Sequence, residues 1–136
     1  MDNYLIFSYG QTIILPFTLK PTKILVQDPD PDIRAILKIA LEEENFVVLT
    51  ASDPNAIVDM ISNFSPELVM LDFRFTGQQS VQVCHMLKSR YPGLPVVAFS
   101  CNSDIDKVYA REGFDDYIRK PFDLDRLYRV LRRHLN

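Results

Sequence analysis

From Lys23 onward, short apolar runs alternate with segments in which apolar residues recur at helical spacing. This alternation is typical of a parallel sheet covered by helices, because the strands of such a sheet are buried on both faces. It predicts an α/β domain with a doubly wound five-stranded parallel sheet and helices on both faces. The predicted strands are "ILV" at 24–26, "FVVLT" at 46–50, "ELVML" at 67–71, "PVVAF" at 95–99 and "DDYI" at 115–118.

The predicted helices carry clear start and stop signals. Asp30 and Asp53 are each followed by a proline, which predicts an aspartate N-cap with proline at the first helical position. Asp123 predicts the N-cap of the last helix. Two further helices are expected over 78–90, closed by "YPG", and over about 103–112, with Gly113 as the C-terminal stop.

Length and charge set bounds on the class of protein. A chain of 136 residues that is 47% apolar fits one folded domain with a single core. Its net charge of −3 provides no strong field for nucleic acid or anionic lipid, so neither partner is expected. Cys84 and Cys101 lie far apart without CxxC spacing. We therefore expect no disulfide framework or zinc site, and a reducing, cytoplasmic setting.

Residues 1–22 precede the predicted domain and are apolar with almost no charge. Asp2 stands where a secretory signal carries positive charge, and Gly10 and Pro16 interrupt a run too short to span a bilayer. We interpret "TIILPFTL" as an extra strand or hairpin laid against the domain or a second copy; non-native residues from an upstream start codon are the alternative. The domain is expected to occupy 23–136, with no output domain after it.

Four polar side chains follow the predicted strands. Asp28, Asp72, Ser100 and Lys120 each come at or just after the carboxyl end of a different strand. Ligands of open α/β sheets bind at this edge, so two acids, a hydroxyl and an amine are expected to converge there. Asp72 follows "LVML" without an evident helix to cap, so its carboxylate must be paired, solvated or bound to a cation.

Residues 23–135 resemble a receiver domain of two-component response regulators. The motifs that carry the resemblance are "ILVQDPDPDIR", "PELVMLDF", "PVVAFSC" and "DDYIRKPF", in the family's order. The resemblance implies a flavodoxin-like, CheY-like fold with strand order 2-1-3-4-5. It also implies a signalling module rather than an enzyme.

The resemblance assigns the central roles to two residues. Asp72 matches the phosphoacceptor, the nucleophile that takes a phosphoryl group from a histidine kinase or phosphotransfer protein. Lys120 matches the family lysine, which pairs with the aspartate and later with a phosphate oxygen. Pro121 implies a cis Lys120-Pro121 bond.

The resemblance further implies a conformational switch. Ser100 matches the hydroxyl that moves toward the phosphate, and Tyr117 matches the aromatic switch position. Phosphate at Asp72 would then bias a surface formed by the helix at 103–112, the strand at 115–118 and the last helix. A downstream protein target is expected to bind that surface. The same surface and the apolar N-terminal segment are both candidate contacts for a homodimer.

The magnesium site implied by the family is incomplete here. Asp28, Asp72 and the backbone carbonyl of Arg74 match its ligands, but Pro29 stands where the family has a second acid. Mg²⁺ binds proteins through about one or two carboxylates together with waters and phosphate oxygens. Weakened Mg²⁺ binding is therefore expected. Asp30 is expected to cap the helix rather than replace the missing ligand.

Four further residues depart from the family near this pocket. The Arg74 side chain could substitute for the cation by pairing with one of the acids, or it could face solvent as a loop arginine. Cys101 is larger than the usual residue after the hydroxyl and could narrow the entrance. Thr76 replaces the family proline, and Ser80 replaces the family glycine.

Two functional hypotheses follow from the resemblance and its departures. One is a slow but competent phosphoacceptor; the other is a degenerate receiver that signals by protein contact alone. Two other classes fit poorly. A phosphatase of the haloacid dehalogenase type needs a second aspartate where Arg74 stands, and a dinucleotide-binding enzyme needs a glycine-rich turn after its first strand, which the chain lacks.

Overall fold

The computed structural model of the chain describes residues 5–8, 11–14, 20–74 and 78–135. Five strands form a parallel sheet in the order β4-β3-β5-β6-β7, which is the predicted order 2-1-3-4-5 within the domain. Each strand overlaps the apolar run that predicted it. The strands are β3 (Lys23–Gln27), β4 (Val47–Ala51), β5 (Leu68–Asp72), β6 (Val96–Ser100) and β7 (Asp116–Arg119).

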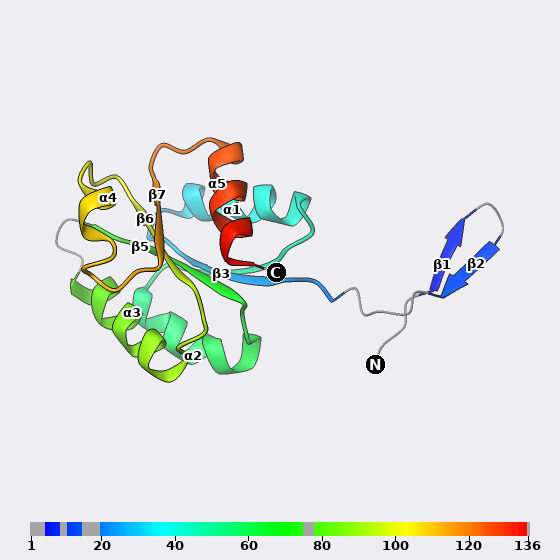
Figure 1. Cartoon of the computed structure of the whole chain (residues 1–136), viewed down its shortest axis with the longest axis horizontal. Helices are drawn as coiled ribbons and strands as arrows, with labels where there is room; N and C mark the ends of the chain where they lie inside the picture. Colours follow the sequence, from blue (N-terminus) through cyan, green and yellow to red (C-terminus); the bar gives the residue numbers. More distant parts are fainter. Residues whose placement is uncertain (1–4, 9–10, 15–19, 75–77, 136) are drawn as a thin grey trace.

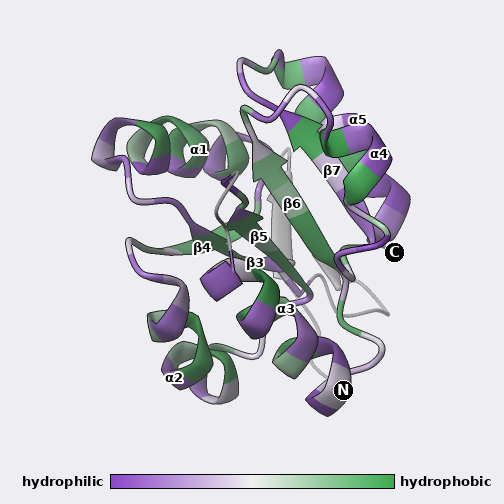
Figure 2. Ribbon diagram, turned by 90° about the vertical axis from the view of Figure 1, so that its left-hand side faces the viewer, coloured by the Kyte–Doolittle hydropathy of each residue, from purple (hydrophilic) through white to green (hydrophobic). Residues whose placement is uncertain are grey.

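Helices cover both faces of this sheet (Figure 1). On one face, α1 (Pro31–Glu43) and α5 (Leu124–His134) pack on a core that includes Leu37, Leu127 and Leu131. On the other face, α2 (Pro54–Phe64) and α3 (Gln78–Arg90) pack on a second core, to which α4 (Ile105–Val108) adds Ile105. Figure 2 shows the mixed hydropathy of the helices beside the hydrophobic central strands. The doubly wound α/β prediction is confirmed.

The predicted helix starts are present. The side chains of Asp30, Asp53 and Asp123 each accept a hydrogen bond from a backbone N–H in the first turn of α1, α2 and α5. Such caps satisfy N–H groups that have no partner inside the helix. As expected, Asp30 is occupied as a cap, through the N–H of Asp32 at 2.9 Å.

The fourth helix is shorter than predicted. A helix over about 103–112 was expected, but α4 covers only Ile105–Val108 and the chain continues in turns. Only Ile105 of this helix is fully buried, so one turn of apolar surface holds the segment, and a short helix gains little stability from its own hydrogen bonds. Gly113, predicted as the stop, has a φ of 101°, which favours glycine.

The N-terminal segment contains a hairpin. Strands β1 (Leu5–Ser8) and β2 (Gln11–Ile14) pair antiparallel, with Leu5 opposite Ile14. They form a two-stranded sheet of their own and add no strand to the parallel sheet. The remainder of the predicted "TIILPFTL" stretch, residues 15–19, lies outside the described residues. None of the described helices is long and apolar enough to cross a membrane.

Strand β4 lies at one edge of the parallel sheet, so one side of its backbone has no neighbouring strand within that sheet. The carbonyl of Val48 accepts a hydrogen bond from Lys38 Nζ of α1 at 3.0 Å. Lysines are among the residues by which natural sheets protect their edge strands.

The packing of helices on both faces of the sheet predicts that two isoleucines contribute very differently to stability. Ile57 of α2 is 0% exposed, whereas Ile39 of α1 is 62% exposed. Ile57→Ala should lower the free energy of unfolding by about 2–5 kcal/mol, because it removes buried methylenes and leaves a cavity. Ile39→Ala, the matched control, should change it by about 0.5 kcal/mol or less. Urea unfolding checks both, and equal midpoint shifts would contradict the placement of α2 over the core.

Candidate functional site

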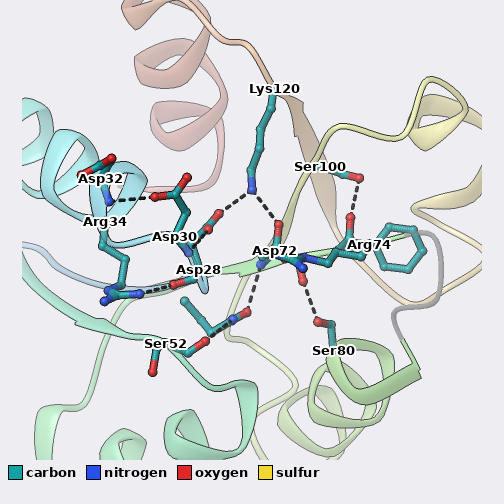
Figure 3. Close-up of polar contacts among 12 residues, drawn as sticks. Asp28, Asp30, Asp32, Arg34, Ser52, Asp72, Arg74, Ser80, Ser100 and Lys120 are labelled. Carbon is teal, nitrogen blue, oxygen red and sulfur yellow. Dashed lines mark hydrogen bonds and ion pairs between the residues drawn. The ribbon is translucent and has the colours of Figure 1, made fainter.

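The carboxyl ends of β3, β5 and β7 bring together three of the predicted site residues. Asp28 follows β3, Asp72 ends β5, and Lys120 follows β7. The ammonium of Lys120 lies between the two carboxylates, with Nζ 2.5 Å from Asp28 Oδ2 and 2.6 Å from Asp72 Oδ1 (Figure 3). One cation therefore joins side chains that are 92 and 48 residues from it in the chain.

Both carboxylates are buried, which makes the lysine necessary. The side chain of Asp28 is 1% exposed and that of Asp72 is 7% exposed. Burial disfavours a charged group unless it is paired and hydrogen-bonded. Burial by itself would lower the pKa of Lys120, but its hydrogen bonds and charge attraction to the two aspartates outweigh this, so the pKa is raised above its ordinary value. Lys120 is therefore positively charged at neutral pH.

The second oxygen of Asp28 is also occupied. Oδ1 accepts the backbone N–H of Asp30 at 2.9 Å, and the Asp28 carbonyl accepts a hydrogen bond from Arg34 at 2.7 Å. These contacts fix the turn that contains Pro29 between β3 and α1. The Lys120-Pro121 peptide bond is cis, as the resemblance implied.

The second oxygen of Asp72 pairs with Arg74. Arg74 Nε lies 2.9 Å from Asp72 Oδ2, and the arginine side chain is 64% exposed. Of the two alternatives for Arg74, the structure therefore shows the pairing with an acid of the pocket. As a result, all four carboxylate oxygens of Asp28 and Asp72 are engaged by an N–H or a cation.

Gln27, a buried glutamine that was not predicted as a site residue, holds the backbone of Asp72 in place. Gln27 is 2% exposed; its Oε1 accepts the N–H of Asp72 at 3.1 Å, and its Nε2 donates to the Ser52 carbonyl at 2.9 Å. This amide ties the end of β5 to the loop after β4. The sequence signal for this role was the polar Gln27 directly after the apolar residues "ILV" of the strand "KILVQ".

Ser80 and Ser100 hold the backbone directly after the Asp72 side chain. Ser80 Oγ donates to the Asp72 carbonyl at 2.6 Å, and Ser100 Oγ donates to the Phe73 carbonyl at 2.5 Å. Ser100 Oγ also accepts the N–H of Asn102 at 3.0 Å. The predicted switch hydroxyl is thus 0% exposed and engaged with backbone, not with the aspartate.

Tyr117, the predicted switch aromatic, lies in β7 at the outer part of the sheet. Its ring is 4.9 Å from that of Tyr109, centroid to centroid. The guanidinium carbons of Arg119 and Arg126 each lie 5.4 Å from the Tyr117 ring centroid. Cation–π contacts of this kind stabilise an aromatic ring in one position.

Two pockets adjoin the Asp72–Arg74 pair. One has a volume of about 450 Å³, and the residues that line it include Pro29, Asp72, Arg74 and Ser80. The other has a volume of about 750 Å³ and reaches Asp28, Lys120 and Cys101. Asp72 is therefore open to a small reactant despite its low exposure.

The two cysteines differ in their surroundings. Cys101 is exposed and contributes to the wall of the larger pocket, where it was expected. Cys84 is a buried residue of α3, and burial raises the pKa of its thiol to about 12. A thiol in such surroundings stays protonated and unreactive at neutral pH.

The described residues of the pocket offer few free oxygens to a divalent ion. Among the described residues, no three acidic, histidine or cysteine side chains come together as metal ligands. Pro29 offers no side-chain oxygen beside Asp28, and the oxygens of both aspartates are already engaged. Mg²⁺ requires near-octahedral oxygen coordination, so an ion bound to Asp72 here would have to displace Lys120 or Arg74 from a carboxylate oxygen. Thr76 lies outside the described residues.

The chain is similar to known receiver domains in sequence and in fold. The sequence model of the response regulator receiver domain matches residues 24–132. The receiver domain of NtrX from Brucella abortus is 34% identical, with 82% of this chain and 97% of that chain covered and a TM-score of 0.74.

Two further solved structures are similar in fold. NtrX from Brucella abortus in complex with ADP is 33% identical, with a TM-score of 0.76, 85% of this chain covered and 27% of that chain covered. This chain thus spans about a quarter of that NtrX chain. The chemotaxis response regulator CheY4 of Vibrio cholerae is 19% identical, with 85% and 100% covered and a TM-score of 0.76.

The order of the strands, the aspartates and lysine at their carboxyl ends, and the match over residues 24–132 agree. The chain belongs to the response regulator receiver domain family.

Proposed function

We propose that this receiver accepts a phosphoryl group on Asp72 from a histidine kinase or a phosphotransfer protein. The observation that carries the proposal is the Lys120 ammonium held between the buried carboxylates of Asp28 and Asp72. A carboxylate beside a pocket and a fixed cation is placed to attack phosphorus while the cation balances the charge that arrives.

The transfer is a displacement at phosphorus. An oxygen of Asp72 forms the new P–O bond as the P–N bond to the donor histidine breaks, and the imidazole nitrogen keeps the bonding electrons and takes a proton from solvent. Lys120, which contacts Asp72 at 2.6 Å, then pairs with an oxygen of the phosphoryl group. The pocket of about 750 Å³ that includes both residues gives the donor access.

We propose that Ser100 and Tyr117 respond to phosphorylation of Asp72 and change the protein surface formed by α4, β7 and α5. Ser100 Oγ would exchange the Phe73 carbonyl, now 2.5 Å away, for a phosphoryl oxygen. Such a shift would move the loop after β6 and the contacts of Tyr117 with Tyr109. The surface of α4, β7 and α5 is therefore the proposed contact for a downstream protein or a second copy.

The alternative function is a degenerate receiver that binds its partners without phosphorylation. Pro29 and the ion pair between Arg74 and Asp72 favour it, since together they remove one ligand of the expected metal site and occupy an oxygen of the acceptor. The two functions differ in a single measurable event, the formation of an aspartyl phosphate.

Asp72→Asn should abolish phosphoryl labelling by a small phosphodonor, because the amide lacks the nucleophilic carboxylate. Intact-protein mass spectrometry after incubation with acetyl phosphate and Mg²⁺ measures the labelled fraction. Asp123→Asn is the matched control: asparagine also caps helices well, and Asp123 does not line either pocket. Equal labelling of wild type and Asp72→Asn would remove the phosphoacceptor proposal, and no labelling of wild type would favour the degenerate receiver.

Lys120→Met should lower the free energy of unfolding by about 3–5 kcal/mol at neutral pH, because it removes the cation that two buried carboxylates share. The folded-state pKa of Lys120 is raised, so its stabilising effect is complete below the ordinary lysine pKa of about 10.4 and is lost as pH rises through the raised value. The difference between wild type and variant should therefore shrink at alkaline pH. Urea unfolding across this range measures it.

Lys107→Met is the control for the loss of charge, since the Lys107 side chain is 75% exposed and its ammonium lies 3.8 Å from Asp104. It should shift stability by about 0.5 kcal/mol or less at every pH. A loss for Lys120→Met no greater than this would contradict the central role given to the lysine.

A further inference from the structure

We propose that Arg74 is the resident counter-cation of Asp72 and excludes divalent metal ions from the acceptor pocket. The expected family ligand at this position is a backbone carbonyl, but the structure places the Arg74 guanidinium itself on Asp72 Oδ2, at 2.9 Å. This inference rests on the pocket of the proposed function. Its first test measures metal binding, which does not depend on whether Asp72 is phosphorylated.

The charges of the pocket are already balanced. Asp28 and Asp72 carry two negative charges, and Lys120 and Arg74 carry two positive charges in direct contact with them. A divalent ion that entered would leave the four side chains and the ion with a net positive charge. In a site where the two carboxylates are buried, that excess is poorly screened and therefore unfavourable.

The coordination geometry is unfavourable as well. Pro29, Asp72 and Arg74 line the same pocket of about 450 Å³, so an ion bound to Asp72 Oδ2 would face a proline ring where an acidic side chain would otherwise supply a second oxygen. It would also have to displace Arg74 Nε from that oxygen. Pro29, which lacks a carboxylate, and Arg74, which adds a positive charge, thus both disfavour the binding of a divalent ion.

Arg74 suits this role because it is tethered close to its partner. It lies two residues after Asp72, and its side chain remains 64% exposed, so the guanidinium keeps part of its hydration while it pairs. An exposed pair of this kind contributes little to stability. The effect of the Arg74–Asp72 pair is that it occupies Asp72 Oδ2. A variant that lacks the Arg74 side chain is therefore expected to fold normally.

Metal binding by the full-length protein provides the test. Mn²⁺, which substitutes for Mg²⁺ at oxygen sites, is titrated and its free fraction is followed by electron paramagnetic resonance. Wild type should bind Mn²⁺ weakly. Arg74→Ala and Arg74→Met should each tighten binding by about tenfold or more, because both remove a unit charge next to the ion. Mg²⁺ competition should release the bound Mn²⁺.

Two comparisons make the result specific. Arg132→Ala removes an equally exposed arginine, 62% exposed and paired with Glu44 far from the pocket, and should leave Mn²⁺ affinity at the wild-type value. Arg74→Met keeps most of the bulk of the side chain without its charge. Unchanged affinity in both Arg74 variants, or tighter binding in Arg74→Ala but not in Arg74→Met, would overturn the proposal.

Restoring the missing acid tests the other half of the argument. Pro29→Asp combined with Arg74→Ala should bind Mn²⁺ more tightly than either single variant, and Asp72→Asn in that background should abolish the gain. If wild type proves unable to form an aspartyl phosphate, the proposed function fails while these affinities still decide the role of Arg74. Tight Mn²⁺ binding by wild type, equal to that of the double variant, would refute it.

Discussion

The pocket depends on one ammonium group held between two buried carboxylates. Lys120 joins the ends of β3, β5 and β7 through Asp28 and Asp72, so one contact holds the carboxyl ends of three strands together. The two aspartate side chains are 1% and 7% exposed, and burying a carboxylate is unfavourable unless it is paired. The parallel sheet supplies the geometry, because it brings the carboxyl ends of strands distant in sequence to one edge.

Much of the fold could be predicted because its signals are local. Apolar runs marked the five strands, and aspartates at helix starts marked α1, α2 and α5. The convergence of Asp28, Asp72 and Lys120 followed from placing polar residues at strand ends. The length of α4 could not be predicted, because it depends on how much of the segment finds a buried surface. Gln27 escaped notice because its two partners lie far away in the sequence.

Arg74 shows where residue types alone leave the outcome open. A loop arginine two residues after an acid has both solvent and the acid as partners, and the loop geometry decides between them. Here the chain places Nε on Asp72 Oδ2. Together with Pro29, this makes the acceptor site one in which charge balance comes from the chain itself. The described residues keep the strand order of the family, while Pro29 and Arg74 differ from the residues that the family resemblance leads one to expect.

Lys38, at the edge of the parallel sheet, affects whether the sheets of two copies can pair. Lys38 Nζ occupies the Val48 carbonyl of β4, the strand that ends the sheet on that side. A second molecule that approached along this margin would have to dislodge a charged amine before its own backbone could bond there. Backbone pairing between the sheets of two copies is thereby disfavoured at this border.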